Sequence, residues 1–419
     1  MFKQNGLSLD QAPPIYVVFR LFFMASIFGV LAGFEILYYQ NSIFDSYSIG
    51  ALTLTHTLTL GVMASFMLGS LFQMLPVIAG VVLDSPTRRS ISIQIPFLLG
   101  ILSLLLAFNL KSYPYLYILA SILLGGSLFW AISMMLYRLL KISNHTASSR
   151  GMVIALISFG ITILLAIYLT TSLYGSIDGA YYLEIKNIHI HFGLFGWIGL
   201  LIFSIAFQVI EMFFVTPPYP TIITKYFAYF ISLLLLLSIL YPVVDILIYL
   251  SIISLSTVTL YRLSQKKRPL SDATIWFWRM GLSSAILSMI FAIIYRVNPI
   301  EIILNLTSIF FISFALSVIF SMFYKIVPFL TWFHLNSQGY FKAPMMHEVI
   351  HPKTAKKQFW IHLSSIISLL ISIFIPNIIY LSGVLIIVSF IWVSYQITHA
   401  HLLYKKIEKS GEKFDFNSV

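Results

Sequence analysis

Long apolar runs are the feature that most constrains this chain. Segments of roughly 20 or more apolar residues, the length needed to cross the ~30 Å hydrocarbon core of a bilayer, recur along nearly the whole sequence. Hydrophobic residues make up 59% of the chain and charged residues 9%, and the mean hydropathy is +0.94. Because helices satisfy their own backbone groups in lipid, the sequence predicts an all-α, polytopic membrane protein whose solvent is the lipid bilayer.

The apolar runs divide into about twelve spans. The connection "YPVVD" at 241–245 is very short, yet the stretch from 225 to 261 suits two spans better than one. The predicted spans lie near 15–39, 50–78, 91–109, 114–137, 151–174, 189–215, 225–242, 245–261, 274–296, 300–330, 358–376 and 378–402.

Basic residues fall in alternate loops, which predicts that both termini are cytoplasmic. The opposite loops carry mainly Asp45, Lys111, Asp178, Glu184, Lys186, Asp245, Arg296 and Glu301. This topology accounts for the net charge of +11, so no nucleic-acid partner is expected. The chain has no cysteine, and any metal would therefore need His, Met or carboxylate ligands. We expect an integral, multi-pass protein of the bacterial inner membrane.

Three segments of the chain resemble one another. "HTLTLG...LFQMLP" from His56 aligns without a gap with "HFGLFG...AFQVIE" from His191, and "FYKIVP" at 323–328 forms a third copy. In that third copy Ser308 stands at the histidine position and Lys325 at the glutamine position. The spans therefore read as three tandem four-helix arcs with pseudo-threefold order, at 15–145, 146–270 and 271–410, within one membrane domain.

The spans and their histidines together resemble the catalytic subunit of haem-copper oxidases. The residues of these motifs, with a histidine followed by Pro76 and Gly80 and a later "HIH", resemble more closely the NnrS-type haem- and copper-containing membrane proteins and their uncharacterised relatives. The resemblance implies haem b or copper as cofactors and His56, His191 or its neighbour His189 as their ligands. In the oxidases further histidines in spans seven and ten complete the binuclear centre. Both spans lack histidine here, so a complete centre is not expected.

The chemistry of imidazole points to the same histidines as ligands, independently of any family resemblance. One ring nitrogen can ligate haem iron or copper while the other N–H is held by an acceptor, for which Thr55, Thr57 and Thr59 are candidates beside His56. The alternative is an interfacial histidine that hydrogen-bonds to a neighbour. Glycines on the same spans predict close approach of either a macrocycle or another helix. His189 and His191 point about 200° apart in a helix, and the repeat alignment favours His191.

A second pattern is a stripe on span two. His56, Met63, Met67 and Met74 fall within about 20° of one line at α-helical spacing. Imidazole and thioether suit cuprous copper, so the stripe is a candidate copper path, although ordinary methionine packing is favoured.

Ionisable groups elsewhere give further candidates. Glu35 and Glu211 lie inside spans, where they would take protons or pair with a base, for example Glu211 with Lys325; snorkelling or carbonyl capping is favoured for Lys325 itself. A cytoplasmic histidine group is read mainly as a solvated interface, with His362 within reach of His399 or His401 as the alternative. That group comprises His334, His347, His351, His362, His399 and His401.

These observations favour a haem- or copper-binding membrane protein that serves electron transfer, sensing of a small diatomic ligand such as nitric oxide, or the response to metal stress, with a redox partner. The competing hypothesis is a cofactor-free secondary transporter or a copper-handling permease, with its substrate near Glu35, the methionine stripe and Glu211. No nucleotide-binding or hydrolase motif is present, and the sequence does not decide whether the protein is an enzyme.

Overall fold

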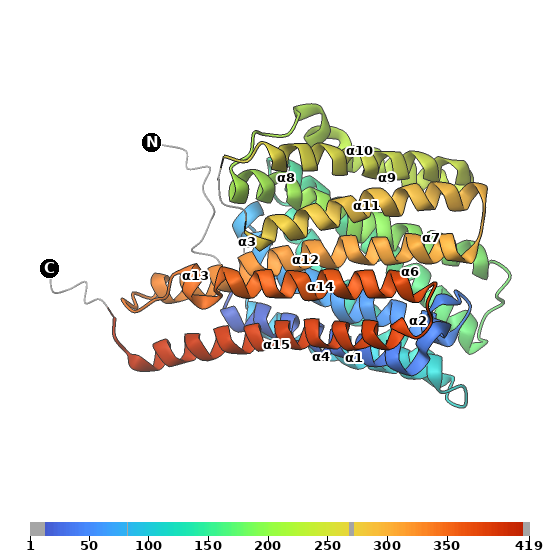
Figure 1. Cartoon of the computed structure of the whole chain (residues 1–419), viewed down its shortest axis with the longest axis horizontal. Coiled ribbons are helices and arrows are strands. Elements are labelled where there is room, and N and C mark those ends of the chain that lie inside the picture. Colours follow the sequence, from blue (N-terminus) through green and yellow to red (C-terminus); the bar gives the residue numbers. More distant parts are fainter. Residues whose placement is uncertain (1–12, 82, 268–271, 414–419) are drawn as a thin grey trace. The chain divides into compact units, whose positions relative to one another are not determined.

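Helices account for nearly all of the chain, as Figure 1 shows. The structure, a computed structural model, describes residues 13–81, 83–267 and 272–413. Within these ranges no strand occurs, and β pairing is limited to one isolated bridge between Tyr340 and Lys413. The predicted all-α class is confirmed.

The first half of the chain forms helices of membrane-spanning length with short connections. Their bounds are α1 (Ile15–Tyr39), η2 (Gln40–Phe44), α2 (Ile49–His56), η3 (Thr57–Ala64), α3 (Ser65–Ala79), α4 (Pro86–Asn109), α5 (Tyr115–Leu139), α6 (Ala147–Tyr174), α7 (Tyr182–His191), η4 (Phe192–Gly199) and α8 (Leu200–Phe214). α2, η3 and α3 follow one another without a break, as do α7, η4 and α8. Two of these helices have side-chain N-caps. The hydroxyls of Ser48 and Thr146 accept the backbone N–H groups of Ala51 and Ser149 at the starts of α2 and α6.

The second half repeats this pattern. Its elements are α9 (Thr221–Leu240), η5 (Pro242–Val244), α10 (Asp245–Ser264), α11 (Ala273–Val297), α12 (Glu301–Ser337), α13 (Met346–Val349), α14 (Pro352–Ser372) and α15 (Ile378–Ser410). The short connection at 241–245 does separate two helices, as predicted. The sixth predicted span begins earlier than expected, at Tyr182 instead of near 189.

Eleven helices in the described ranges are long and apolar enough to cross a membrane, which makes this a multi-pass integral membrane protein. The predicted eleventh span exists as helix α14, 21 residues long, but it is not among the eleven. Its composition explains the difference, since it contains Lys353, Lys356, Lys357, His362 and a series of serines.

Packing divides the chain into two compact units. Unit 1 contains α4 to α10 with the adjoining parts of α3, α11 and α12, and unit 2 contains α1 to η3, the remaining parts of those three helices, and α13 to α15. In described residues, unit 1 covers 72–81, 83–267 and 282–315, and unit 2 covers 13–71, 272–281 and 316–413. The three predicted repeats stay a prediction.

Within unit 2, the two ends of the sequence pack together. α1 lies along α15, and small residues allow the close approach: a Cβ on Gly29 would lie 2.2 Å from the Phe390 ring, and one on Gly33 would lie 2.8 Å from the carbonyl oxygen of Gly383. Within unit 1, α6 packs against α5, α8 and η4. Gly151 and Gly196 lie close to Ser204 and Ser158 at these contacts. Glycine thus serves helix packing in both units.

Candidate functional site

His56 closes helix α2 and precedes a π-helical segment in unit 2. η3, from Thr57 to Ala64, has the wider i→i+5 hydrogen bonding of a π-helix, a feature common at functional sites. The Nδ1 atom of His56 lies 2.9 Å from the carbonyl oxygen of Leu52. Because a carbonyl only accepts, Nδ1 carries the hydrogen, and in a neutral ring Nε2 holds the lone pair. The acceptor is therefore backbone, not one of the threonine hydroxyls predicted beside it.

His191 has the same local geometry in unit 1. Its Nδ1 lies 2.8 Å from the carbonyl oxygen of Asn187, four residues back, as Leu52 is from His56. η4 begins one residue after His191, at Phe192, and is eight residues long, like η3 after His56. At the third aligned position, Ser308 donates its hydroxyl to Leu304 at 2.9 Å within the continuous α-helix α12. The two histidine positions thus share a backbone arrangement that the serine position lacks.

His191 also contacts a buried carboxylate that the sequence analysis placed in a loop. Its Nε2 lies 3.3 Å from Oδ2 of Asp245, whose side chain is 5% exposed, and Nη1 of Arg296 lies 3.6 Å from the same oxygen. α7, α10 and α11 supply these three side chains. Asp245 is the first residue of α10 because the η5 turn of Pro242–Val244 brings the chain back directly into a helix.

This cluster requires a proton between imidazole and carboxylate. Nδ1 of His191 already donates to Asn187, so the contact of Nε2 with Asp245 is favourable only when one of those two groups is protonated. Arg296 adds a permanent positive charge. Oδ1 of Asp245 is buried and has no hydrogen-bond partner among the described residues. Asp245 and Arg296 are the functional candidates that sequence reasoning missed.

Aromatic rings enclose one side of the cluster. The ring centroid of Phe195 lies 5.6 Å from that of His191 and 5.7 Å from that of Tyr249. Tyr249 lies one turn along α10 from Asp245. His189 faces elsewhere, since its Nδ1 lies 3.0 Å from the carbonyl oxygen of Thr162 in α6. The two histidines of "HIH" therefore have separate partners, as their helical spacing predicts.

Glu35 is a second buried carboxylate, in unit 2. Its Oε1 accepts the hydroxyl of Thr57 at 2.7 Å, and its Oε2 is buried without a partner among the described residues. Glu35 is 8% exposed and Thr57 fully buried. Glu35 is thus linked to the residue that follows His56, whereas Asp245 contacts His191 itself.

The glycines near the histidines do not form a cradle for a macrocycle. A Cβ on Gly61 would lie 2.6 Å from the Phe28 ring, and one on Gly196 would lie 2.7 Å from Cβ of Ser158. Neighbouring helices therefore fill both glycine faces, so the helix-packing alternative is correct for these two residues. The orientation of His56 fits a haem or copper ligand, because its Nδ1 is held by a carbonyl. His191 does not fit in this arrangement, since its Nε2 contacts Asp245.

The predicted stripe of His56 and methionines is interrupted. Its alignment assumed α-helical rotation between His56 and Met63, but η3 is π-helical over that stretch and turns less per residue. Met63, Met67 and Met74 are all at most 5% exposed. Their burial favours the packing interpretation.

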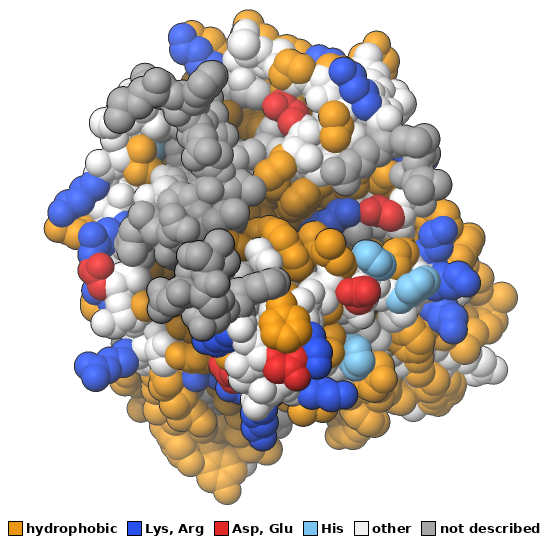
Figure 2. All heavy atoms as spheres, turned by 90° about the vertical axis from the view of Figure 1, so that its left-hand side faces the viewer, with side chains coloured by type: hydrophobic (Ala, Val, Ile, Leu, Met, Phe, Trp, Pro, Cys, Tyr) orange, Lys and Arg blue, Asp and Glu red, His pale blue; other side chains and the backbone are white. Residues whose placement is uncertain are grey.

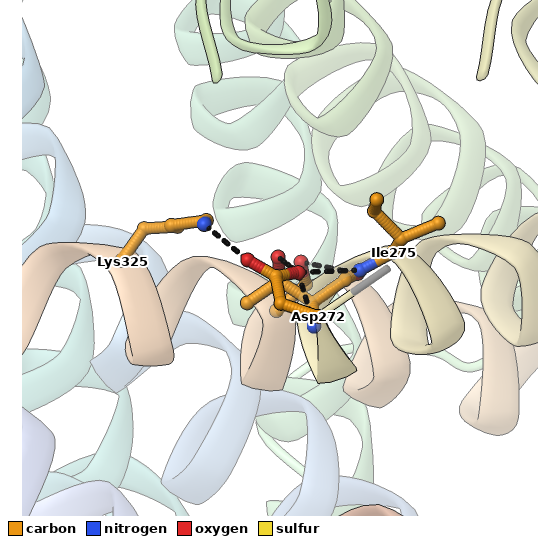
Figure 3. A network of polar contacts seen from close by, with 5 residues as sticks. Asp272, Ile275 and Lys325 are labelled. Atoms are coloured by element: carbon orange, nitrogen blue, oxygen red, sulfur yellow. Dashed lines mark hydrogen bonds and ion pairs between the residues drawn. The ribbon is translucent and has the colours of Figure 1, made fainter. Parts of the chain in front are cut away.

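Glu211 and Lys325 have local partners. Oε1 of Glu211 accepts the backbone N–H of Tyr219 at 2.8 Å, which ties the loop after α8 to that helix in unit 1. In unit 2, Nζ of Lys325 lies 2.7 Å from Oδ2 of Asp272, as Figure 3 shows. Lys325 thus forms an ion pair instead of only snorkelling.

Asp272 combines that ion pair with a helix cap. Its Oδ1 accepts the backbone N–H groups of Thr274 and Ile275 at 3.0 and 3.3 Å and also the Thr274 hydroxyl. Burial raises the pKa of Asp272, but the charge and hydrogen bond of Lys325, with the Thr274 and Ile275 donors, outweigh it, and the net pKa is lowered.

His362 corrects the interpretation of the cytoplasmic histidine group. It lies within α14, is 2% exposed, and places Nε2 3.0 Å from the hydroxyl of Ser317, with Phe277 and Phe320 against its ring. The solvated-interface interpretation is wrong for this residue. Its polar partner is also not His399, which is exposed and stacks on Tyr395.

The rest of that histidine group is closer to expectation. His347 and His351 are exposed, His401 is half-buried, and Figure 2 shows histidine side chains among lysine and arginine side chains on one face. Within the described ranges, no three His, Asp or Glu side chains are grouped so as to hold a metal ion.

Comparison with known proteins assigns the chain to no family. No family model matches the chain, and no curated protein matches it. The site itself therefore carries the functional argument.

Proposed function

We propose that this protein is a membrane-integral haem- or copper-binding protein of the haem-copper oxidase-like class, with His56 as a cofactor ligand. The observation that carries the proposal is the 2.9 Å contact between Nδ1 of His56 and the carbonyl of Leu52. This contact fixes the orientation of the ring and places a hydrogen on Nδ1, and we assign the ligating role to Nε2. A bound cofactor would supply a redox change or an open position for a small diatomic ligand such as nitric oxide.

The surrounding residues have separate tasks in this proposal. Glu35 accepts the hydroxyl of Thr57, the residue after the ligand, and so fixes the start of η3 that follows His56. His191 is assigned with Asp245 and Arg296 to a charged cluster instead of to the cofactor, because its Nε2 is engaged. One residue from this chain thus ligates the cofactor, and no complete binuclear centre forms.

Optical spectra and elemental analysis of the purified full-length protein test this proposal. We expect a Soret band, or stoichiometric copper, that His56→Ala removes or shifts and that His145→Ala leaves unchanged. His145 is a suitable control because its Nδ1 lies 3.3 Å from the hydroxyl of Ser149, four residues along the chain, and it belongs to neither site. Protein with neither haem nor copper, expressed with both supplied, contradicts the proposal.

A second candidate is a cofactor-free secondary transporter, favoured by the buried cluster of His191, Asp245 and Arg296. Charged groups within spans commonly bind coupling ions or substrates. Substrate uptake by intact cells that requires Asp245, in protein free of cofactor, supports this candidate.

The finer topology also belongs to the proposal. We infer that α14 is the twelfth span, that both termini are cytoplasmic in a bacterial inner membrane, and that the spans form three four-helix arcs. Reporter fusions at both termini test the orientation. An active periplasmic reporter at either end contradicts it.

A further inference from the structure

α14 is polar on its inner side and apolar on its outer side. Gln358, His362, Ser365 and Ser372 are each at most 2% exposed and fall within about 80° of arc at 100° per residue. The opposite side carries the exposed side chains Trp360, Ile367 and Ile371. This order is the reverse of that in a helix on a water-soluble protein. It explains why α14 has the length of a span but not the overall hydropathy of one.

α15 repeats the reversed order against α14. Ser382, Ser389 and Gln396 are at most 4% exposed and recur every seventh residue, which places them on one side of the helix. The exposed side chains of α15 include Val384, Val388 and Ile391. α14 and α15 pack together within unit 2, so their polar sides meet in its interior.

Hydrogen bonds join these helices to one another and to α12. Nε2 of Gln358 donates to the hydroxyl of Ser389 at 3.1 Å, and His362 contacts Ser317 of α12 at 3.0 Å. One turn further along α12, Ser321 donates to the carbonyl of Thr274 at 3.0 Å.

The line of polar groups continues along α12 to the ion pair drawn in Figure 3. Lys325 follows Ser321 by one turn of α12 and pairs with Asp272, whose side chain is 40% exposed. The interior polar groups are thus joined along α12 to a group that solvent reaches.

Gln358 leaves one strong acceptor unsatisfied in this interior. Its side chain is fully buried, yet Oε1 has no hydrogen-bond partner among the described residues. A buried amide oxygen without a partner loses its hydration with nothing to replace it. Ser365, Ser372 and Ser382 donate to carbonyls of their own helices, and His362 contacts Ser317. These bonds do not explain a buried glutamine whose Oε1 has no partner among the described residues.

We propose that the interior of unit 2 between α12, α14 and α15 is a hydrophilic path for small uncharged solutes that donate hydrogen bonds, water included. Its lining consists of hydroxyl, amide and imidazole groups, which recognise such molecules by hydrogen bonding. The charges of Lys325 and Asp272 neutralise each other at its end. The path does not depend on the cofactor proposed at His56.

The absence of cysteine from the chain permits a direct test. Single cysteines at Ser365 and Ser389 place a thiol on the polar sides of α14 and α15, and Ile367→Cys and Ile391→Cys place one two residues away on the exposed sides. Ser→Cys substitutions nearly conserve volume, so folding should be retained. The probe is methyl methanethiosulfonate, a small uncharged thiol reagent, applied to the full-length protein in nanodiscs at fixed pH.

We expect S365C and S389C to react at least tenfold faster than I367C and I391C, because only an aqueous environment supports formation of the reactive thiolate. Addition of urea should slow the two polar-side reactions if the path binds it. Equal or slower reaction at Ser365 and Ser389 overturns the proposal. If S365C and S389C react fast and urea does not slow them, the result supports a path that admits water but not urea.

Discussion

Nε2 of His191 lies 3.3 Å from Oδ2 of Asp245, and the other nitrogen of the same ring contacts the carbonyl of Asn187. The two contacts cannot both be favourable without a proton on Nε2 or on the carboxylate. A histidine that the repeat pattern marks as a cofactor ligand is therefore also held by an acid that lies far from it in sequence. The cluster ties His191 to charged groups of α10 and α11.

Asp245→Asn should destabilise the protein by about 1.5–3 kcal/mol, the range for a hydrogen bond to a charged group, since His191 and Arg296 then lose the negative charge of their common partner. The thermal unfolding midpoint of the solubilised protein measures the effect. Asp178→Asn is the control, because Asp178 is exposed in the loop before α7. In a double-mutant cycle, His191→Gln and Asp245→Asn should be non-additive. Additive effects would show that the pair contributes nothing.

Thr57→Val should lower the free energy of unfolding by about 1–3 kcal/mol. The substitution removes the hydroxyl that donates to Oε1 of the buried Glu35 carboxylate. Glu35→Gln should cost less, since an amide oxygen can still accept from Thr57. Thr59→Val serves as the control, because that hydroxyl donates only to Thr55 of its own helix. Chemical unfolding of the three variants in the same detergent compares them, and a cost at Thr59 equal to that at Thr57 would contradict the assignment.

The Asp272–Lys325 pair predicts a pH dependence. Asp272 has a lowered pKa when folded, so the pair stabilises the protein fully above the ordinary aspartate pKa of about 3.9. That contribution is lost as the pH falls through the lower, folded-state pKa.

Asp272→Asn isolates this effect, because asparagine still caps α11 but carries no charge. The variant should unfold at a lower temperature than the wild type at pH 7. The difference should shrink as the pH falls below about 4. Asp178→Asn, at an exposed position, is the matched loss of a negative charge. A difference that stays constant from pH 7 to pH 3 would rule out the ion pair as its cause.

Gly196→Ala should destabilise unit 1. The new methyl group would lie 2.7 Å from Cβ of Ser158, so α6 or η4 must move. Gly126→Ala is the opposite case, since nothing lies within 4 Å of its Cβ, and it should stabilise α5 by about 0.4–1 kcal/mol. Thermal unfolding of the two variants should therefore shift in opposite directions. A shift of Gly196→Ala to higher temperature would mean that the close contact is absent.

Sequence reasoning located the helices and both histidines but not their partners. His56 and His191 were found by their shared register above Gly61 and Gly196. Asp245 was counted among the loop charges although a span was predicted to start at it, because nothing in "YPVVD" shows that this carboxylate packs against His191 and Arg296. The π-helical segments after both histidines also gave no signal, since i→i+5 bonding is not encoded by apolar periodicity.

The sequence by itself determined the solvent and the class of fold, because runs of apolar residues long enough to cross a bilayer leave few alternatives to a bundle of helices. It also determined which residues are chemically capable of binding a cofactor. Only the tertiary structure decided which polar groups meet. Asp245 joins His191 and Arg296, Lys325 joins Asp272, and the polar side of α14 turns inward. The physical reason is that helix periodicity fixes which residues share a side of one helix, whereas side-chain packing fixes which helix that side faces.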